Sequence, residues 1–457
     1  MKNDLLKGNP IRAVILFALP IMASSLLQYS YNFVDNIIVG RYVGTEALAA
    51  VGNISSINSF IIGTALGLTS GFTIPVAQKF GAQDYKAMNK YAGNSIALSF
   101  LIGVVIAVVA HFISDPILRL INTPEDIIEL SAAYINILYF GVPIQMLFNN
   151  FTGIARALGD SKRPLYFLVV SVIVNLALDI LLVRNLGMGV EGAAFATVFS
   201  YFVAAVFAGI YVLKKEKGLD VKLSDLKLSG RHCWEQLKLG IPVSLQFTIT
   251  SIGSMVLQTA INAFGSSAIA AITAAGRVEQ VMNIPMSGLG VSNSTFVSQN
   301  YGAKQYERIL RSVKNIFILD LLVSVACSAV LIFAGPHVVQ WFVDEPDAQL
   351  LSYADQYLYT IGGCYMFVSV LFVFRNTLQG LGCTYANAIA GAGELVGRIL
   401  VAYLFTPVFG FAAVCFAGPC AWVLADIPLI VIYLRKRKKF KALIQSQEGV
   451  KPCRTTM

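Results

Sequence analysis

The sequence has few charged residues. Asp, Glu, Lys and Arg make up 13% of its 457 residues, whereas roughly a quarter is usual for a soluble protein. Hydrophobic residues reach 56%, and the mean hydropathy is +0.69. Apolar runs of about 20 residues, long enough to cross a hydrocarbon core of about 30 Å, recur along the whole chain. This composition excludes a soluble globular protein and predicts an all-α polytopic membrane protein.

The sequence also has little that could bind a transition metal. It contains three histidines and seven cysteines, and none of the cysteines forms the closely spaced pair that is typical of a metal site. Most of the cysteines lie in apolar runs, which indicates small core residues. We therefore expect neither a metal site nor a cofactor.

Apolar segments of spanning length are abundant, and twelve of them are predicted to cross the membrane. Their ends are approximate, because hydropathy changes gradually at a membrane surface. The predicted spans are 13–39, 47–77, 92–112, 130–155, 164–184, 189–213, 234–262, 268–297, 312–334, 352–375, 385–407 and 411–434.

The positive charges are distributed unevenly between the connectors. Both termini and the connectors on their side carry 29 Lys and Arg residues, and the opposite connectors carry three. Cytoplasmic connectors are enriched in Lys and Arg, so both termini are predicted to be cytoplasmic, in the plasma membrane or the bacterial inner membrane. The net charge of +9, including the tail RKRKKFK, is thus interpreted as a mark of topology beside anionic membrane lipid, with no nucleic-acid partner.

The chain contains an internal repeat. VAQKFGAQDYK at 76–86 matches VSQNYGAKQYE at 297–307, and GTEALAA at 44–50 matches GSSAIAA at 265–271. A constant offset indicates duplication of a six-span unit, and an even number of spans gives both copies the same orientation. We predict two six-helix lobes related by a pseudo-twofold axis along the membrane normal. The predicted domains are an N-terminal lobe at 1–213, a cytoplasmic linker at 214–233, a C-terminal lobe at 234–434 and a basic cytoplasmic tail at 435–457.

Four oxygen-bearing side chains are predicted to share one depth in the outer half of the first lobe. Asp35 lies near the outer end of the first span, and Asp179 lies near the outer end of the fifth, with Asn175 one turn deeper. Thr197 lies about two turns inside the outer start of the sixth span. An acid in a span is unfavourable by roughly 2.5–3.5 kcal/mol on insertion scales, so such residues are usually functional.

Carboxylate, amide and hydroxyl oxygens suit a hard cation or a proton. Two close carboxylates do not both remain ionised cheaply, unless a cation lies between them. An ion-coupled transporter would use such a site in this way. The alternative is that each acid only forms a hydrogen bond with a neighbouring helix, although the second repeat has no acid at the corresponding positions.

Together these segments resemble the multidrug and toxic compound extrusion (MATE) transporters. The resemblance covers nearly the whole chain and is carried by VDNIIVGRYVGTEALAAVG at 34–52, ARALGDSKRP at 155–164, NLALD at 175–179 and the duplicated Gln-x-x-Gly-Ala elements. It implies a two-lobed, V-shaped fold of twelve spans. The implied activity is the export of amphipathic, often cationic compounds in exchange for H⁺ or Na⁺.

The resemblance also implies roles for individual residues. Asp35, Asn175, Asp179 and Thr197 correspond to the cation site of the N-terminal lobe, and Pro20 corresponds to the proline at which the first helix bends. An acid expected in the seventh helix is replaced by Thr250, so we expect coupling through the N-terminal lobe. The residues that we assign to the substrate cavity are Gln28, Tyr31, Gln145, Met146, Asn149, Gln246 and Met282.

Other charged residues lie in spans of the second half, among them Arg277, Glu279, Glu394 and Arg398. Glu394 and Arg398 are one helical turn apart and could form an ion pair. We predict a C-lobe ionic network of all four residues. Its role as a structural clamp or as a path for substrate or protons stays open.

The sequence therefore predicts a secondary-active efflux antiporter, expected to be a monomer, for small amphipathic cations. An alternative within the same superfamily is a flippase or exporter of a lipid-linked or other amphipathic metabolite. A passive channel would need a ring of like charges. An intramembrane aspartyl protease would need Tyr-Asp and Gly-x-Gly-Asp motifs, but Val34 precedes Asp35 and Leu178 precedes Asp179. We expect no enzymatic activity.

Overall fold

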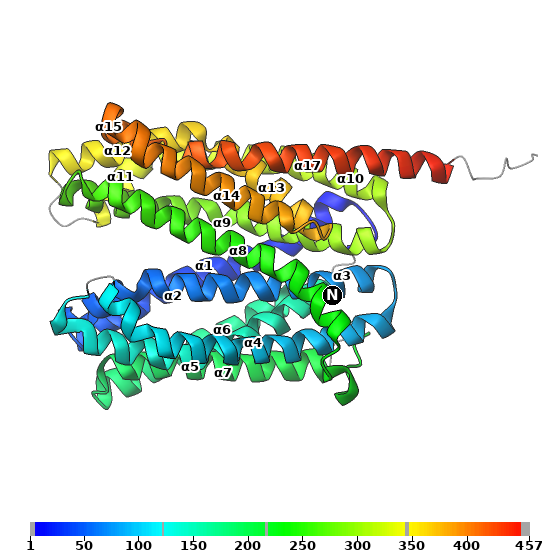
Figure 1. Cartoon of the computed structure of the whole chain (residues 1–457), viewed down its shortest axis with the longest axis horizontal. Coiled ribbons are helices and arrows are strands. Elements are labelled where there is room, and N and C mark those ends of the chain that lie inside the picture. The colour runs from blue at the N-terminus through cyan, green and yellow to red at the C-terminus, as the bar shows by residue number, and fades with distance from the viewer. Residues whose placement is uncertain (1–4, 121–122, 215–217, 343–346, 449–457) are drawn as a thin grey trace, which may run out of the picture. The chain divides into compact units, whose positions relative to one another are not determined.

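The computed structural model describes residues 5–120, 123–214, 218–342 and 347–448, and all regular structure within these ranges is helical (Figure 1). The end of the predicted tail, 449–457, and part of the predicted linker, 215–217, lie outside the described residues. The elements of the first half are α1 (Pro10–Tyr42), α2 (Thr45–Phe72), α3 (Ile74–Gly81), α4 (Tyr85–Leu120), α5 (Glu125–Ala157), α6 (Lys162–Asp179), the π turn η1 (Ile180–Asn185) and α7 (Gly189–Lys214).

The second half begins with a short 3₁₀ turn and repeats the same succession of long helices. Its elements are η2 (Leu223–Leu226), α8 (Gly230–Asn262), α9 (Ser266–Gly302), α10 (Tyr306–Phe333), α11 (Gly335–Val339), η3 (Gln340–Phe342), α12 (Ala348–Cys364), α13 (Met366–Gly380), α14 (Tyr385–Leu400), η4 (Val401–Phe405), α15 (Thr406–Phe409), α16 (Phe411–Cys415) and α17 (Ala417–Glu448).

The predicted all-α polytopic class is confirmed. Each of the twelve predicted spans coincides with a long helical segment of the described chain. Ten of these are long and apolar enough to cross a membrane on their own, and α12 with α13 makes an eleventh that is bent by 54°. The twelfth segment is α9, which has 37 residues but is less apolar because it contains Arg277, Glu279 and many Ser, Asn and Gly residues.

Contacts within the chain group the described residues into two compact units. Unit 1 contains 17–80 and 84–251, and unit 2 contains 5–16, 81–83 and 252–448. In unit 1, α5 packs against α2, α4 and α7, and α6 packs against α7. In unit 2, α9 packs against α10, α12 and α13, and α14 packs against α17. The helix α1 changes from unit 2 to unit 1 after Leu16.

Few residues of the first helix are fully buried. Only 22% of its most apolar stretch is buried, the lowest share among the candidate spans. Its interior contains Pro20, which has no N–H to complete the helical ladder. One turn later Ser24 Oγ donates to the carbonyl of Pro20 at 2.8 Å, and Ser25 Oγ donates to that of Ile21 at 3.2 Å. The missing ladder hydrogen bond at Pro20 and these hydroxyl bonds to the preceding turn both favour bending in this part of α1.

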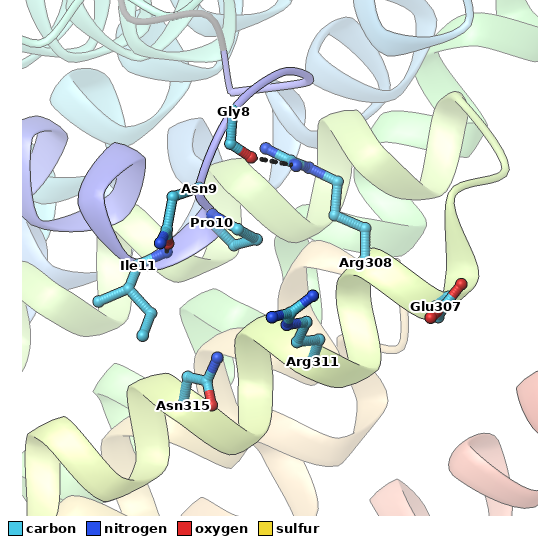
Figure 2. Close-up of a pocket in the computed structure, with 8 residues that line it drawn as sticks. All are labelled: Gly8, Asn9, Pro10, Ile11, Glu307, Arg308, Arg311 and Asn315. Atoms are coloured by element: carbon cyan, nitrogen blue, oxygen red, sulfur yellow. Dashed lines mark hydrogen bonds between the residues drawn. The ribbon is translucent and has the colours of Figure 1, made fainter.

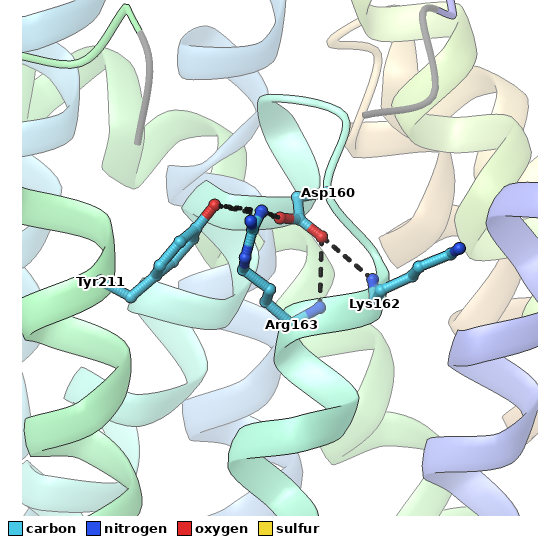
Figure 3. Close-up of polar contacts among 4 residues, drawn as sticks. All are labelled: Asp160, Lys162, Arg163 and Tyr211. Carbon is cyan, nitrogen blue, oxygen red and sulfur yellow. Dashed lines mark hydrogen bonds and ion pairs between the residues drawn. The ribbon is translucent and has the colours of Figure 1, made fainter. Parts of the chain in front are cut away.

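The turn between α5 and α6 is fixed by Asp160, which is 5% exposed. Its Oδ1 accepts hydrogen bonds from the backbone N–H groups of Lys162 and Arg163, at 3.1 and 3.2 Å, and so caps α6. Its Oδ2 accepts from Arg163 Nη1 at 2.5 Å and from Tyr211 Oη at 3.1 Å (Figure 3). The conspicuous GDSKRP segment therefore joins the start of α6 to the end of α7, and its role is structural.

The backbone repeats the duplication that the sequence indicates. Gln83 and Lys304 occupy corresponding positions in the two copies, and both have a left-handed backbone, with φ of 58° and 57°. This conformation is uncommon for residues other than glycine. Gly159 and Gly382 also correspond, with φ of 88° and 74°. The same turn geometry has thus been kept in both halves, even where the side chains differ.

Candidate ion-coupling site

Three helices of unit 1 bring the predicted polar side chains together. Tyr31 on α1 and Thr197 on α7 share a hydrogen bond of 3.2 Å between their hydroxyl oxygens. Asn175 on α6 is 1% exposed, and its Nδ2 donates to Thr197 Oγ1 at 3.5 Å. Thr197 is therefore the common partner that connects α1, α6 and α7.

Asp35 and Asp179 face each other at the same place. Their carboxyl groups lie within hydrogen-bonding reach of one another, and Asp179 is 1% exposed. Among the described residues, Asp35 Oδ1 and both carboxyl oxygens of Asp179 are buried without a donor. Two ionised carboxylates have no proton to share, so the pair can interact favourably only when a proton or a cation lies between them.

A small cavity adjoins the acid pair. Its volume is about 120 Å³, whereas pockets for drug-sized ligands are about 300 Å³ or larger. The cavity can therefore hold water or a small cation, but it is too small for an amphipathic drug. Its polar lining comes from α1, α2, α5 and α7, and includes Tyr31, Asp35, Asn58, Tyr134, Gln145 and Thr197.

The site ends at a change of helix type. The α-helical part of α6 ends at Asp179, and the π turn η1 follows at once. Wide turns of this kind are frequent at functional sites. However, η4 interrupts the corresponding helix of the second half in the same way, directly after α14, and no acid is present there. The π turn is thus a feature of the repeated fold, and Asp179 is the part that distinguishes the first copy.

The other residues assigned to the substrate cavity are dispersed. Gln28 Nε2 donates to Tyr201 Oη at 3.4 Å, and Gln246 is 6% exposed, with its Nε2 3.5 Å from Thr250 Oγ1. Gln145 lines the small cavity, while Asn149 and Met282 are half-buried. Met146 is different from the others, because it is fully buried in the apolar core of unit 1.

In unit 2, Glu394 is the centre of an ionic cluster. It is 3% exposed, it pairs with Arg375 of α13, and Arg398 Nη2 lies 3.8 Å from its Oε2. Glu279 accepts a hydrogen bond of 2.8 Å from Tyr357 Oη and lies within electrostatic range of Arg398. The fourth predicted member, Arg277, is exposed on α9.

Several charged and polar residues of these sites were not identified from the sequence. Arg375 is the last residue of the predicted span 352–375, but it lies inside α13 and its side chain is only 12% exposed. Asp320 and Asp426 are 0% and 4% exposed, and their carboxyl oxygens are buried without a hydrogen-bond partner among the described residues. Both acids lie within predicted spans, so an acid inside an apolar run was the available signal. Tyr134 lies near Asp35 and Asp179, but a tyrosine in an apolar run does not stand out in the sequence as an acid does.

Comparison with known proteins shows the family to which the chain belongs. The sequence profile of the MatE family matches the chain twice, at residues 20–181 and 242–404, so the two halves are copies of one unit. The "Probable multidrug resistance protein YpnP" of Bacillus subtilis is 28% identical over 410 residues, which are 89% of this chain and 90% of that protein. The "FAD transporter" of Shewanella oneidensis is 24% identical, over 96% of this chain and 98% of its own.

Solved structures show the same fold. A crystal structure described as "MATE in the bent conformation" is 26% identical to this chain and has a TM-score of 0.87. The alignment covers 97% of this chain and 98% of that one. Because the profile match covers most of the chain in two copies and the twelve-helix, two-lobed fold is shared, this protein belongs to the MatE family of multidrug and toxic compound extrusion transporters.

Proposed function

We propose that this chain exports small amphipathic, cationic molecules and takes up H⁺ or Na⁺ in exchange, through the Asp35–Asp179 site. The observation that carries the proposal is the buried pair of facing carboxyl groups. Three of their oxygens lack a hydrogen-bond donor among the described residues, so the site is complete only with a bound proton or cation. The similarity to a protein named for multidrug resistance supports the substrate class.

Binding of the ion would change the electrostatics of α1. With no ion, the ionised carboxylates of Asp35 and Asp179 repel each other, which favours a conformation in which α1 and α6 separate. A proton or a cation removes this repulsion and holds the two helices together. Because few residues of α1 are fully buried and it contains Pro20, it can respond by bending without disrupting the packed helices α5, α6 and α7. The similar structure described as being in a bent conformation supports a conformational change in this fold.

The small cavity fits the ion and its water, so we propose that the substrate binds at another position lined by residues such as Gln28 and Gln246. The proposed topology, with both termini in the cytoplasm, places the acid pair in the outer half of the membrane. An ion that enters from the outside down its gradient would therefore drive the substrate outward. The cycle needs no covalent step and no cofactor, and one polypeptide contains both repeats, so we propose a monomeric transporter without enzymatic activity.

The coupling ion can be identified with everted membrane vesicles. Uptake of a fluorescent lipophilic cation into these vesicles, which corresponds to export from the cell, would be followed with an imposed pH gradient and, separately, with an imposed Na⁺ gradient. One gradient should drive dye transport and the other should not, and the double variant Asp35→Asn/Asp179→Asn should respond to neither. Equal transport by this variant would refute coupling through the acid pair.

A second candidate function is the export of an anionic amphipathic metabolite. It is favoured by the similarity to a protein named as an FAD transporter, which covers nearly the whole of both chains. The same vesicles distinguish the two, because a cation exporter would transport the lipophilic dye, while a metabolite exporter would transport a flavin nucleotide and ignore the dye.

A further inference from the structure

The site around the acid pair of unit 1 has a counterpart in unit 2, which the internal repeat locates. The repeated elements at 44–50 and 76–86 recur 221 residues later, so α9 follows α2 at this offset. The helix α5 and the pair α12–α13 are offset by 223 residues at both ends (125 and 348, 157 and 380), and α6 and α14 begin with the same offset (162 and 385). Three polar positions of unit 1 thereby gain counterparts in unit 2: Asn58, Tyr134 and Asn175 correspond to Glu279, Tyr357 and Arg398.

The three counterparts lie together in unit 2. Tyr357 Oη donates a hydrogen bond of 2.8 Å to Glu279 Oε2, just as the residues at these two positions line one cavity in unit 1. Arg398 lies within electrostatic range of both Glu279 and Tyr357. Its Nη2 is also 3.8 Å from Oε2 of Glu394, one turn earlier on α14. Each unit therefore has a polar site built from the same positions of the repeat.

The two sites differ in where their positive charge comes from. In unit 1 the carboxyl groups of Asp35 and Asp179 face each other, and three of their oxygens have no donor among the described residues. In unit 2 the guanidinium of Arg398 lies near two carboxyl groups, those of Glu279 and Glu394. Arginine keeps its proton in proteins, so this charge is permanent. Unit 2 thus contains, as a side chain, the cation that the acid pair of unit 1 lacks.

Arg398 is enclosed by its neighbours. Its side chain is 13% exposed, and it lies against α8 at Gly253, where an added Cβ would be 2.8 Å from Arg398 Nη1. A larger residue at Gly253 would therefore push the guanidinium from its place. The close approach of α8 keeps the charge of Arg398 beside the two acids.

Another arginine of unit 2 has a different use. Arg308, near the start of α10, donates hydrogen bonds to the backbone carbonyls of Leu5, Lys7 and Gly8, at 3.2, 2.8 and 2.6 Å. Figure 2 shows its guanidinium directed at the segment that leads into α1. These bonds tie that segment to α10, whereas Arg398 brings its charge to carboxyl groups inside the spanning helices.

We propose that Arg398 is a built-in cation that fills the second copy of the ion site and so confines ion binding to unit 1. This inference rests on the proposed function, which assigns ion binding to Asp35 and Asp179. A charge that cannot leave compensates Glu279 at every stage of the cycle, so unit 2 needs neither a proton nor a cation from outside. Arg398 thus limits each cycle to the ion that is bound in unit 1.

Other titratable groups also surround Glu279. Tyr357 approaches it from α12, and Tyr365 Oη, at the end of α12, donates to the backbone carbonyl of Glu279 at 3.4 Å. Further titratable or charged side chains of this region are Arg277, Cys327, Arg375, Cys415 and Asp426. All of these groups stay unchanged in the variants of the test, so a new dependence on pH or Na⁺ can be assigned to Arg398 and Glu279.

The test uses the full-length protein in detergent, with Asp35→Asn/Asp179→Asn as the background, so that unit 1 contributes no ion effect. Arg398→Asn is added to this background and gives unit 2 the residue type that unit 1 has at this position. Arg398→Lys is the matched control, because lysine keeps the positive charge. The melting temperature of each protein is measured at several pH values and Na⁺ concentrations.

At neutral pH without Na⁺, Arg398→Asn should melt several degrees below the background, because Glu279 has lost its charge compensation. Low pH or high Na⁺ should restore most of this loss, since a proton or a cation then binds at Glu279. The background and Arg398→Lys should show no such recovery. Absence of recovery in Arg398→Asn under both conditions, equal recovery in Arg398→Lys, or Na⁺-dependent melting of the background would overturn the proposal.

A second variant keeps the test decisive if Arg398→Asn does not fold. Glu279→Gln, added to Arg398→Asn, removes the acid together with its cation and should restore folding without any ion. Failure of this rescue would show that Arg398 acts through packing, and it would overturn the proposal. Because Asp35 and Asp179 are replaced in every protein compared, these outcomes are distinct from failure of the proposed function, which vesicle transport by the same background tests separately.

Discussion

Asp179→Asn separates ion coupling from folding more sharply than any other single change in this protein. The substitution keeps the size of the side chain and removes one of the two facing charges. Asp179 is 1% exposed and neither of its oxygens has a donor among the described residues, so no hydrogen bond from the described chain stabilises the native carboxylate. An asparagine amide could donate to the buried Asp35 Oδ1, and a hydrogen bond to a charged group is worth about 1.5–3 kcal/mol. The variant should therefore melt at the wild-type temperature or above it.

Transport should respond in the opposite direction. Two carboxyl groups that share one proton or one monovalent cation give one ion per cycle, so a 100-fold ion gradient can sustain at most about a 100-fold gradient of a singly charged substrate. That gradient corresponds to about 2.7 kcal/mol. In Asp179→Asn the remaining acid has an amide partner and no second charge to neutralise. The substrate gradient should then fall to about one.

The assay is the accumulation of a fluorescent cation in proteoliposomes with an imposed ion gradient, together with thermal melting in detergent. Glu191→Gln is the matched control, because Glu191 is an exposed acid on α7 and its removal should change neither measurement. The reasoning is wrong if Asp179→Asn accumulates substrate like the wild type. It is also wrong if the variant loses accumulation only because it no longer folds.

Three further predictions follow from the packing. Pro20→Ala should slow efflux several-fold with unchanged substrate binding, because it restores the hydrogen bond that Pro20 removes from the interior of α1. Pro242→Ala in α8 is the control, and equal loss of binding in both variants would refute a hinge at Pro20. Glu394→Gln should destabilise the protein by about 3–5 kcal/mol, more than Arg398→Ala does, because it removes the anion that pairs with two largely buried cations, Arg375 and Arg398. The reverse order of melting temperatures would show that Arg375 has another partner. Asp160→Ala should lower stability by about 2–3 kcal/mol. Asp160→Asn keeps the oxygen that accepts from the start of α6, so it should lower stability by less than half as much. Equal losses in the two variants would assign the effect to the ion pair with Arg163 alone.

The order of Glu394 and Arg398 in these predictions shows what sequence reasoning lacks. From the sequence, Glu394 has one candidate partner, Arg398, four residues away. Arg398→Ala would then be expected to harm folding more than Glu394→Gln, because Glu279 could still pair with Arg398 when Glu394 is lost. In the structure Glu394 also pairs with Arg375 on a neighbouring helix, which reverses the expectation. Spacing along one helix is visible in a sequence, whereas contacts between helices depend on how each helix is rotated about its axis.

The same limit explains what was and was not predicted of the acid site. The depth of Asp35, Asn175, Asp179 and Thr197 follows from counting residues along each span, because every residue advances the helix by a fixed rise. Tyr134 enters the site through the packing of α5, which leaves no mark in the sequence. Met146 was expected in a cavity but is buried in the apolar core, since a methionine fits both environments.

Some breaks in the helices also have causes beyond hydropathy. The segment predicted at 352–375 is bent by 54° after two consecutive glycines, Gly362 and Gly363, which weaken a helix locally. The predicted span at 47–77 is divided at Thr73, whose hydroxyl donates to the carbonyl of Ser70 at 3.0 Å. Apolar composition fixes how many segments are long enough to span, but local backbone chemistry decides where they bend.

The most direct test of ion coupling is to measure the ion released when substrate binds. Purified protein in weakly buffered detergent solution would be mixed with the transported cation, with released protons followed by a pH indicator and the affinity for substrate measured at several Na⁺ concentrations. Coupling through Asp35 and Asp179 predicts about one proton released per protein molecule, or competition between Na⁺ and substrate, with neither effect in Asp179→Asn. Substrate binding by the wild type with no proton release and no competition by Na⁺, or the same release in Asp179→Asn, would contradict it.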